Sequence, residues 1–297
     1  MNYYIMSILK IVYSAFIHTT NIFRSLAGNN IKNNIYYNDE SDININNWNI
    51  TKVINLIGDI FFIKLPIYCP NWVPYPIKKL FFGDNSEYIP DYHEHSNNKS
   101  IIFVNGIMSN KDVVQLNRKK LYNIFKHPIN IIYNSSDSLV SDLIECLIGK
   151  TTQSLTEAST VALYSICKSL LNPEIKKLII ICHSQGTIII SSVLKNLHKL
   201  GLNKEDYLKK LEIYAFSNCA SKMNYIINEL PYMEHFANEH DFVAKLGCNH
   251  DKDIDHLISI DGKTFITKNK YGHMFNSHYI DNFENDYPNS KLLTYIN

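Results

Sequence analysis

The sequence predicts an α/β fold, in which helices pack on both faces of a mostly parallel central sheet, with an N-terminal helical extension added. From residue 100 onward, short apolar runs alternate with longer segments of helical periodicity, which is typical of buried parallel strands joined by helices. A hydrophobic fraction of 45% against 19% charged residues, in a chain of 297 residues, is enough for a sizeable buried core. We therefore expect an extension over residues 1–97 and a main α/β domain over residues 98–297.

The start of the chain, MNYYIMSILKIVYSAFIHTTNIFR, is strongly apolar. Its apolar residues recur at helical spacing, at Ile5, Leu9, Val12 and Phe16. Lys10 interrupts this apolar run, and no basic segment precedes the run. The run is also shorter than the roughly 18 apolar residues of a membrane span. We expect an amphipathic helix that packs on the protein's own core, with contact to a membrane surface and a cleaved signal peptide as alternatives.

The rest of the extension contains two apolar segments, residues 53–62 and 77–82. A proline-rich stretch separates them, with prolines at positions 66, 70, 74 and 76, and this spacing excludes a regular helix there. We expect a helix or two in the extension, which could cover part of a site in the main domain. The stretch YIPDYHEHSNNKS closes the extension.

The main domain is predicted element by element from its periodicity. Strands are expected at residues 100–107, 129–134, 177–183, 211–217, 233–241 and 256–261, and helices at residues 111–125, 139–147, 158–171 and 187–200. In open α/β sheets, sites form beyond the carboxyl ends of the strands. Candidate functional residues are therefore sought there.

Charge and cysteine usage exclude several classes of function. The 29 basic and 28 acidic residues give a net charge near +1, which offers no attraction for nucleic acid. The six cysteines contain no CxxC pair, so we expect buried thiols, no metal and no cofactor. A zinc site from Cys248, His250 and His256 is the alternative to an ordinary polar loop there.

A candidate nucleophile lies in ICHSQGT, where Ser184 stands between a strand and a helix. This is the context of a nucleophile elbow, in which the residues two before and two after the serine must be small. Gly186 meets this requirement, whereas Cys182 replaces the usual first glycine. The backbone N–H of Gln185, at the helix N-terminus, would then be one oxyanion donor. The alternative is an ordinary polar break between two buried segments.

A second oxyanion donor is expected from the loop after an earlier strand. IIFVNGIMSN contains a glycine turn at the end of such a strand, and we assign the donor to the backbone N–H of Ile107. Gly106 would allow the chain to approach closely. Alternatively, Asn105 and Gly106 form only a turn.

The acid and base are expected in the chain order serine, carboxylate, histidine. Asp241 follows a predicted strand, and Glu239 is the competing carboxylate. Downstream, His273 follows a glycine in a polar loop and is the preferred base. His278 is the alternate base, or a residue that packs on a helix face or holds the loop.

These motifs together resemble the α/β-hydrolase superfamily, most closely the lipase-like branch found in fungi and large DNA viruses. The resemblance rests on FVNGI, YNSS with Asp142 shortly after, CHSQG, ANEHDFVAKLG and GHMFNSHY, in that order, and spans about residues 97–285. It implies that Ser184 is the nucleophile, Asp241 the acid and His273 the base. It also implies that Gln185 and Ile107 supply the oxyanion donors. Cys182 and Asn105 depart from the usual family pattern.

The expected function is a serine hydrolase that cleaves carboxylic esters, with lipids as the favoured substrates. A non-catalytic protein that binds a lipid or a partner through the same pocket is the alternative, and acyl transfer to an alcohol would use the same residues. We expect an intracellular protein, with peripheral membrane association through the N-terminal segment as the alternative. The oligomeric state is left open.

Overall fold

Within the part of the chain that the structure describes, the main structural element is a seven-stranded sheet in the order β1-β3-β2-β4-β5-β7-β9, in which β1 is antiparallel to β3 and the other pairings are parallel. The computed structural model describes residues 85–91, 98–106, 109, 111–135, 156–250 and 258–296. The strands of this sheet are β1 Glu87–Ile89, β2 Lys99–Val104, β3 Ile129–Tyr133, β4 Lys177–His183, β5 Leu211–Phe216, β7 Tyr232–Asn238 and β9 Lys263–Thr267. This architecture confirms the predicted α/β class.

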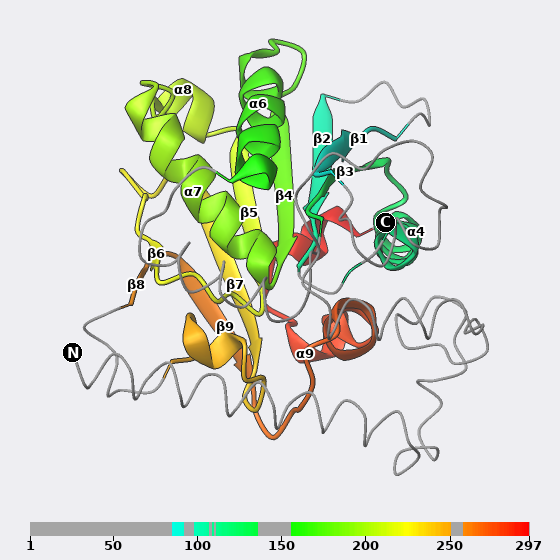
Figure 1. Ribbon diagram of the computed structural model, residues 1–297. Coiled ribbons are helices and arrows are strands. Elements are labelled where there is room, and N and C mark those ends of the chain that lie inside the picture. Colours follow the sequence, from blue (N-terminus) through cyan, green and yellow to red (C-terminus); the bar gives the residue numbers. More distant parts are fainter. Residues whose placement is uncertain are drawn as a thin grey trace, which may run out of the picture.

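Helices cover both faces of the sheet (Figure 1). The longer ones are α4 Lys111–Phe125, α6 Glu157–Leu171 and α7 Gln185–Lys199. The shorter ones are α8 Glu205–Leu208, η3 Ala244–Leu246, η5 Phe275–Ile280, α9 Phe283–Asp286 and η6 Lys291–Tyr295. A separate pair of short strands, β6 Lys222–Met223 and β8 Ser259–Ile260, forms a second parallel ladder.

The continuous apolar runs of the sequence fold as central strands because both of their faces are buried. In β4, Ile180 and Cys182 pack with α6 and α7, whereas Ile179 and Ile181 pack with α4 and the C-terminal helices. Successive side chains of a strand point to opposite faces, so a strand covered on both sides must be apolar at every position. Among the described residues, the two largest hydrophobic clusters therefore lie on opposite sides of the sheet.

Several predicted elements are confirmed at or near their expected bounds, notably β4, α4 and α7. Within the strand predicted over residues 256–261, Ser259–Ile260 form a strand, and it pairs with β6 outside the main sheet; residues 256 and 257 lie outside the described residues. The seventh strand of the main sheet is β9 instead. The helix expected over residues 139–147 lies outside the described residues.

The proposed N-terminal extension, residues 1–97, lies almost entirely outside the described residues. Within it, β1 pairs with β3 at one edge of the sheet, Glu87 opposite Tyr133, so the main sheet begins before residue 98. Among the residues that the structure describes, no helix is both long enough and apolar enough to cross a bilayer.

Candidate active site

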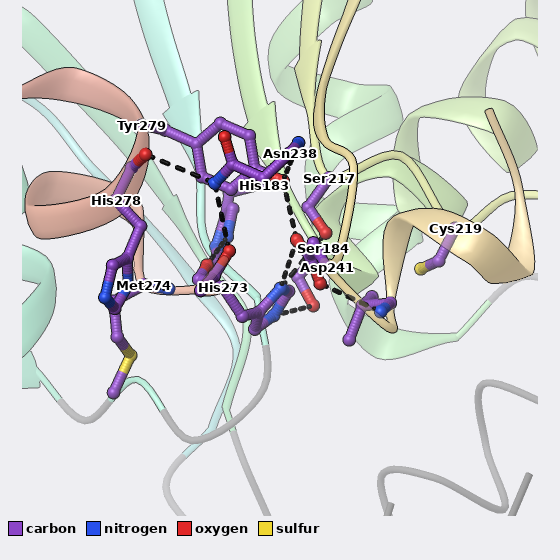
Figure 2. A network of polar contacts seen from close by, with 12 residues as sticks. His183, Ser184, Ser217, Cys219, Asn238, Asp241, His273, Met274, His278 and Tyr279 are labelled. Atoms are coloured by element: carbon purple, nitrogen blue, oxygen red, sulfur yellow. Dashed lines mark hydrogen bonds and ion pairs between the residues drawn. The ribbon is translucent and has the colours of Figure 1, made fainter. Parts of the chain in front are cut away.

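The candidate site lies where the carboxyl ends of the neighbouring strands β4, β5 and β7 meet (Figure 2). Ser184 follows β4, Ser217 follows β5, and Asp241 follows β7 after a short turn. His273 comes from the loop between β9 and η5. Because parallel strands end at the same edge of a sheet, residues far apart in the chain are brought together there.

Ser184 occupies a sharp turn between β4 and α7. Its backbone has φ 55° and ψ −126°, a conformation that non-glycine residues adopt rarely and at a cost of about 1–3 kcal/mol. The turn is tightly packed, since a Cβ added at Gly186 would lie 2.5 Å from the Val104 carbonyl oxygen. The fully buried Cys182, which replaces the usual glycine, is accommodated on β4. The turn therefore has the geometry of a nucleophile elbow.

A line of hydrogen bonds connects the three residues singled out in the sequence. Ser184 Oγ lies 3.0 Å from His273 Nε2, and His273 Nδ1 lies 3.0 Å from Asp241 Oδ2. The Asp241 side chain is fully buried, whereas the His273 side chain retains 15% of its exposure. The structure thus brings Ser184, His273 and Asp241 together in the order in which a nucleophile, a general base and an orienting acid would stand.

Asp241 is held by donors on both of its carboxylate oxygens. Tyr279 donates its hydroxyl to Oδ2 at 2.6 Å, and the Val243 N–H donates to Oδ1 at 2.9 Å. Burial by itself would raise the pKa of Asp241. The facing His273 and the hydrogen bonds from His273, Tyr279 and Ser217 outweigh burial and hold that pKa well below its ordinary value.

An ionised Asp241 fixes the protonation of His273. A carboxylate can only accept hydrogen bonds, so Nδ1 of the histidine carries the proton and donates it to Oδ2. In the neutral ring, Nε2 is then an acceptor directed at the hydroxyl of Ser184. This tautomer is the one that can take a proton from the serine.

His183, next to the candidate nucleophile, supports the loop that carries His273. Its Nε2 lies 2.8 Å from the His273 carbonyl oxygen, and the two rings have centroids 4.7 Å apart. Burial and the neighbouring His273 lower the pKa of His183 to about 3, so the ring is neutral and donates this bond through Nε2–H. His183 therefore links the end of β4 to the backbone of the candidate base.

His278, the alternate base, makes different contacts. Its Nδ1 accepts a hydrogen bond from the Met274 N–H at 3.0 Å, and its ring lies against Gly272, where an added Cβ would come within 2.4 Å of it. Gly272 has φ 102°, a conformation that favours glycine. These contacts fit the other role considered for His278, which is to hold the loop.

Glu239, the competing carboxylate, turns toward a different part of the surface. It accepts hydrogen bonds from Lys268 Nζ at 2.9 Å and from the Asn269 N–H at 2.7 Å. These contacts lower its pKa, the largest effect coming from the Asn269 backbone. The structure brings Asp241, and not Glu239, to His273.

Of the two expected oxyanion donors, Gln185 lies within the described residues. Gln185 is the first residue of α7, directly after Ser184, and the first amides of a helix have no acceptor within the helix. Ile107 lies outside the described residues. The preceding Gly106 packs directly on the serine, because a Cβ added there would lie 2.6 Å from Ser184 Cβ.

No group of three or more metal-binding side chains occurs among the described residues. Of the zinc alternative, Cys248 and His250 are described, and His256 lies outside the described residues. Burial raises the pKa of the Cys248 thiol to about 12.

Sequence reasoning missed three residues of this site. Ser217 places its hydroxyl 3.0 Å from His273 Nδ1, and its backbone has φ 50°. Tyr279 bonds Asp241, and His183 bonds the base loop. The only available signal was position: Ser217 and His183 each stand at the carboxyl end of a predicted central strand, where site residues collect.

Comparison with known proteins gives one family match. Residues 94–222 match the family described as "Putative serine esterase (DUF676)". The matched segment contains Ser184, whereas Asp241 and His273 lie beyond its end. No curated protein matches the chain in sequence.

Solved structures with a similar chain path are described as hydrolases. A "predicted CIB-like hydrolase" from Thermoplasma acidophilum is 14% identical with a TM-score of 0.40, over 67% of this chain and 93% of that one. A dienelactone hydrolase from Anabaena variabilis is 8% identical with a TM-score of 0.37, over 64% and 88%. A "Putative hydrolase" from Agrobacterium vitis is 10% identical with a TM-score of 0.39, over 72% and 99%.

Proposed function

We propose that this protein is a serine esterase that cleaves carboxylic esters through Ser184, His273 and Asp241. The observation that carries the proposal is the continuous line of 3.0 Å contacts from Ser184 Oγ through the His273 ring to Asp241 Oδ2, with the serine on a strained turn. The family match over residues 94–222 supports the same class of reaction.

The reaction follows from the proton positions. Ser184 Oγ attacks the ester carbonyl carbon while His273 Nε2 takes the hydroxyl proton, and the carbonyl oxygen becomes an oxyanion. The Gln185 N–H, at the helix N-terminus, stabilises that charge. The tetrahedral intermediate then expels the alcohol, which receives the proton from His273, and an acyl-enzyme remains. A water molecule deprotonated by the same imidazole attacks the acyl group, releases the acid and restores Ser184.

Asp241 stabilises the imidazolium that forms in each step. Its depressed pKa keeps it ionised, and Tyr279 and Val243 hold it in place, so its charge is set before the reaction begins. A preorganised charge of this kind requires no reorientation when the proton moves.

The test is labelling of the purified protein with a fluorophosphonate probe, which reacts with activated serines. We expect labelling of the wild type, none of Ser184→Ala, strongly reduced labelling of His273→Ala and retained labelling of His278→Ala. Well-folded wild type that does not label would favour a non-catalytic binding protein. Equal labelling of Ser184→Ala would remove Ser184 as the nucleophile.

We propose lipid esters as the substrate class within this reaction. The support is the resemblance to lipase-like hydrolases and the apolar segments of residues 1–97, which could also bring the protein to a membrane surface. Hydrolysis rates for p-nitrophenyl esters of 2 to about 16 acyl carbons test this, because each additional buried CH₂ adds about 0.8 kcal/mol of binding. A preference for the shortest ester would contradict the lipid assignment. Adding an excess of alcohol and measuring ester product separates acyl transfer from hydrolysis.

A further inference from the structure

Three amide side chains form a buried chain beside Ser184 that the triad does not use. Asn105 follows β2, Asn134 follows β3, and Gln185 begins α7. Their exposed fractions are 0%, 6% and 7%. Buried amides require hydrogen-bond partners, so their contacts show what they hold in place.

Asn105 connects the ends of two adjacent strands. Its Oδ1 accepts from the Asn134 N–H at 2.8 Å, and its Nδ2 donates to the Asn134 carbonyl at 2.9 Å. The same Nδ2 donates to the Gly106 carbonyl, also at 2.9 Å. Only an amide offers an acceptor and two donors in this arrangement, since a carboxylate has no donor and an alkyl group has neither.

Asn134 continues the connection to the helix behind the serine. Its Nδ2 donates to Gln185 Oε1 at 2.5 Å. The chain of amides therefore runs from Gly106, which packs on Ser184 from one side, to Gln185, which follows Ser184 on the other. The two backbone segments that flank the nucleophile are tied to each other through side chains.

We propose that Asn105 and Asn134 are positioning residues for the oxyanion site. This inference rests on the proposed esterase function. Asn134 holds the side chain of Gln185, whose backbone N–H is the proposed oxyanion donor, and Asn105 in turn holds the backbone of Asn134. Without these bonds, the first residue of α7 would lose its side-chain anchor beside Ser184. Oxyanion donors act only when they are held near 3 Å from the developing charge.

The test separates positioning from general stability. Asn105→Ala and Asn134→Ala are compared with Asn196→Ala, a matched control in which a buried asparagine of α7 loses a 2.8 Å bond to the Ser192 carbonyl. The measurements are kcat and KM for a p-nitrophenyl ester, the inhibition constant of an alkyl trifluoromethyl ketone, and thermal unfolding. This ketone forms a tetrahedral oxyanion with an active serine, so its affinity reports on the oxyanion site.

We expect kcat to fall about 10–100-fold in both test variants, and the affinity for the ketone to fall by a similar factor. KM should change less than about 3-fold. The reason is that a misplaced donor weakens stabilisation of the transition state more than binding of the substrate. Asn196→Ala should keep all three kinetic values. If Asn105→Ala does not fold, Asn134→Ala decides, because the bonds from the Asn105 side chain to the backbone of residue 134 do not involve the Asn134 side chain and survive its loss.

Two negative results are distinguishable. Folded Asn105→Ala and Asn134→Ala proteins with wild-type kcat and ketone affinity would overturn the positioning role while leaving the esterase intact. A folded wild type without hydrolysis or fluorophosphonate labelling would overturn the proposed function and this inference with it.

Discussion

Glu212, at the start of β5, lies at the centre of a buried cluster that joins the sheet to the C-terminal segment. The side chain is 1% exposed and accepts hydrogen bonds from Lys177 Nζ at 2.8 Å and Lys291 Nζ at 2.7 Å. The hydroxyls of Tyr214 and Tyr295 donate to its second oxygen at 2.7 and 2.8 Å. We predict that Glu212→Gln destabilises the fold in a manner that depends on pH.

The magnitude follows from the pKa of the carboxyl group. Burial alone would raise the pKa of Glu212, but the four hydrogen bonds lower it from 4.5 to about 2. At ~1.36 kcal/mol for each pKa unit, the lowered pKa corresponds to about 3 kcal/mol in the free energy of unfolding. We expect a contribution of about 2–3 kcal/mol, because both lysines are partly exposed to water. Since the folded pKa is the lower one, this stability is present above pH 4.5 and is lost as the pH falls toward 2.

The assay is urea unfolding followed by circular dichroism, from pH 7 down to about pH 3.5. The wild type should exceed Glu212→Gln by about 2–3 kcal/mol in free energy of unfolding at pH 7, and by about 1 kcal/mol less at pH 3.5. Glu174→Gln, a change of an exposed glutamate, should stay within ~0.5 kcal/mol of the wild type at each pH. A difference that is below 1 kcal/mol, or that is constant with pH, would refute this account of the cluster.

Two further changes test the site. Asp241→Asn keeps the size of the side chain but removes its charge and its preference for one His273 tautomer, so kcat for an ester should fall by about 10⁴ while the protein stays folded. A loss below about 10-fold would exclude Asp241 as the orienting acid. Gly186→Ala places a methyl group 2.5 Å from the Val104 carbonyl oxygen, and urea unfolding should show a loss of about 1–3 kcal/mol. An unchanged midpoint would show that the turn is not closely packed.

The central strands and helices could be predicted because their burial produces a recognisable pattern of apolar residues in the local sequence. In β4, apolar side chains on both faces produce the unbroken run LIIIC, and α4 shows the periodicity of a helix with one buried side. The sequence of the edge strand β9 has no such pattern. Its residues, KTFIT, are exposed or partly exposed at every position, and its backbone pairs only with β7 within the described residues. The strand forms through pairing, which periodicity does not reveal.

In the candidate site, too, some residues could be predicted from the sequence and others could not. The order of serine, carboxylate and histidine narrowed the candidates to Ser184, to Asp241 or Glu239, and to His273 or His278, because chemistry limits the residue types that can fill those roles. The contacts of His273 with Ser184 and with Asp241 are visible only in the structure. The supporting contacts of Ser217 and Tyr279 depend on how β5 and η5 pack beside Asp241. Serine and tyrosine are common in other settings, so nothing in their local sequence distinguishes these two.

The spacing of the site along the chain has a consequence for synthesis on the ribosome. His273 lies 89 residues after Ser184, and Asp241 lies between them. At ~5–20 residues per second, the ribosome completes the serine turn about 4–18 s before the histidine exists. In one part of that interval, after β5 is completed at Phe216 and before β7 is completed at Asn238, the apolar β5 is an open edge because its outer partner is missing. Under the proposed function, Ser184 therefore stays unreactive until the last quarter of the protein, which carries Asp241 and His273, docks beside it.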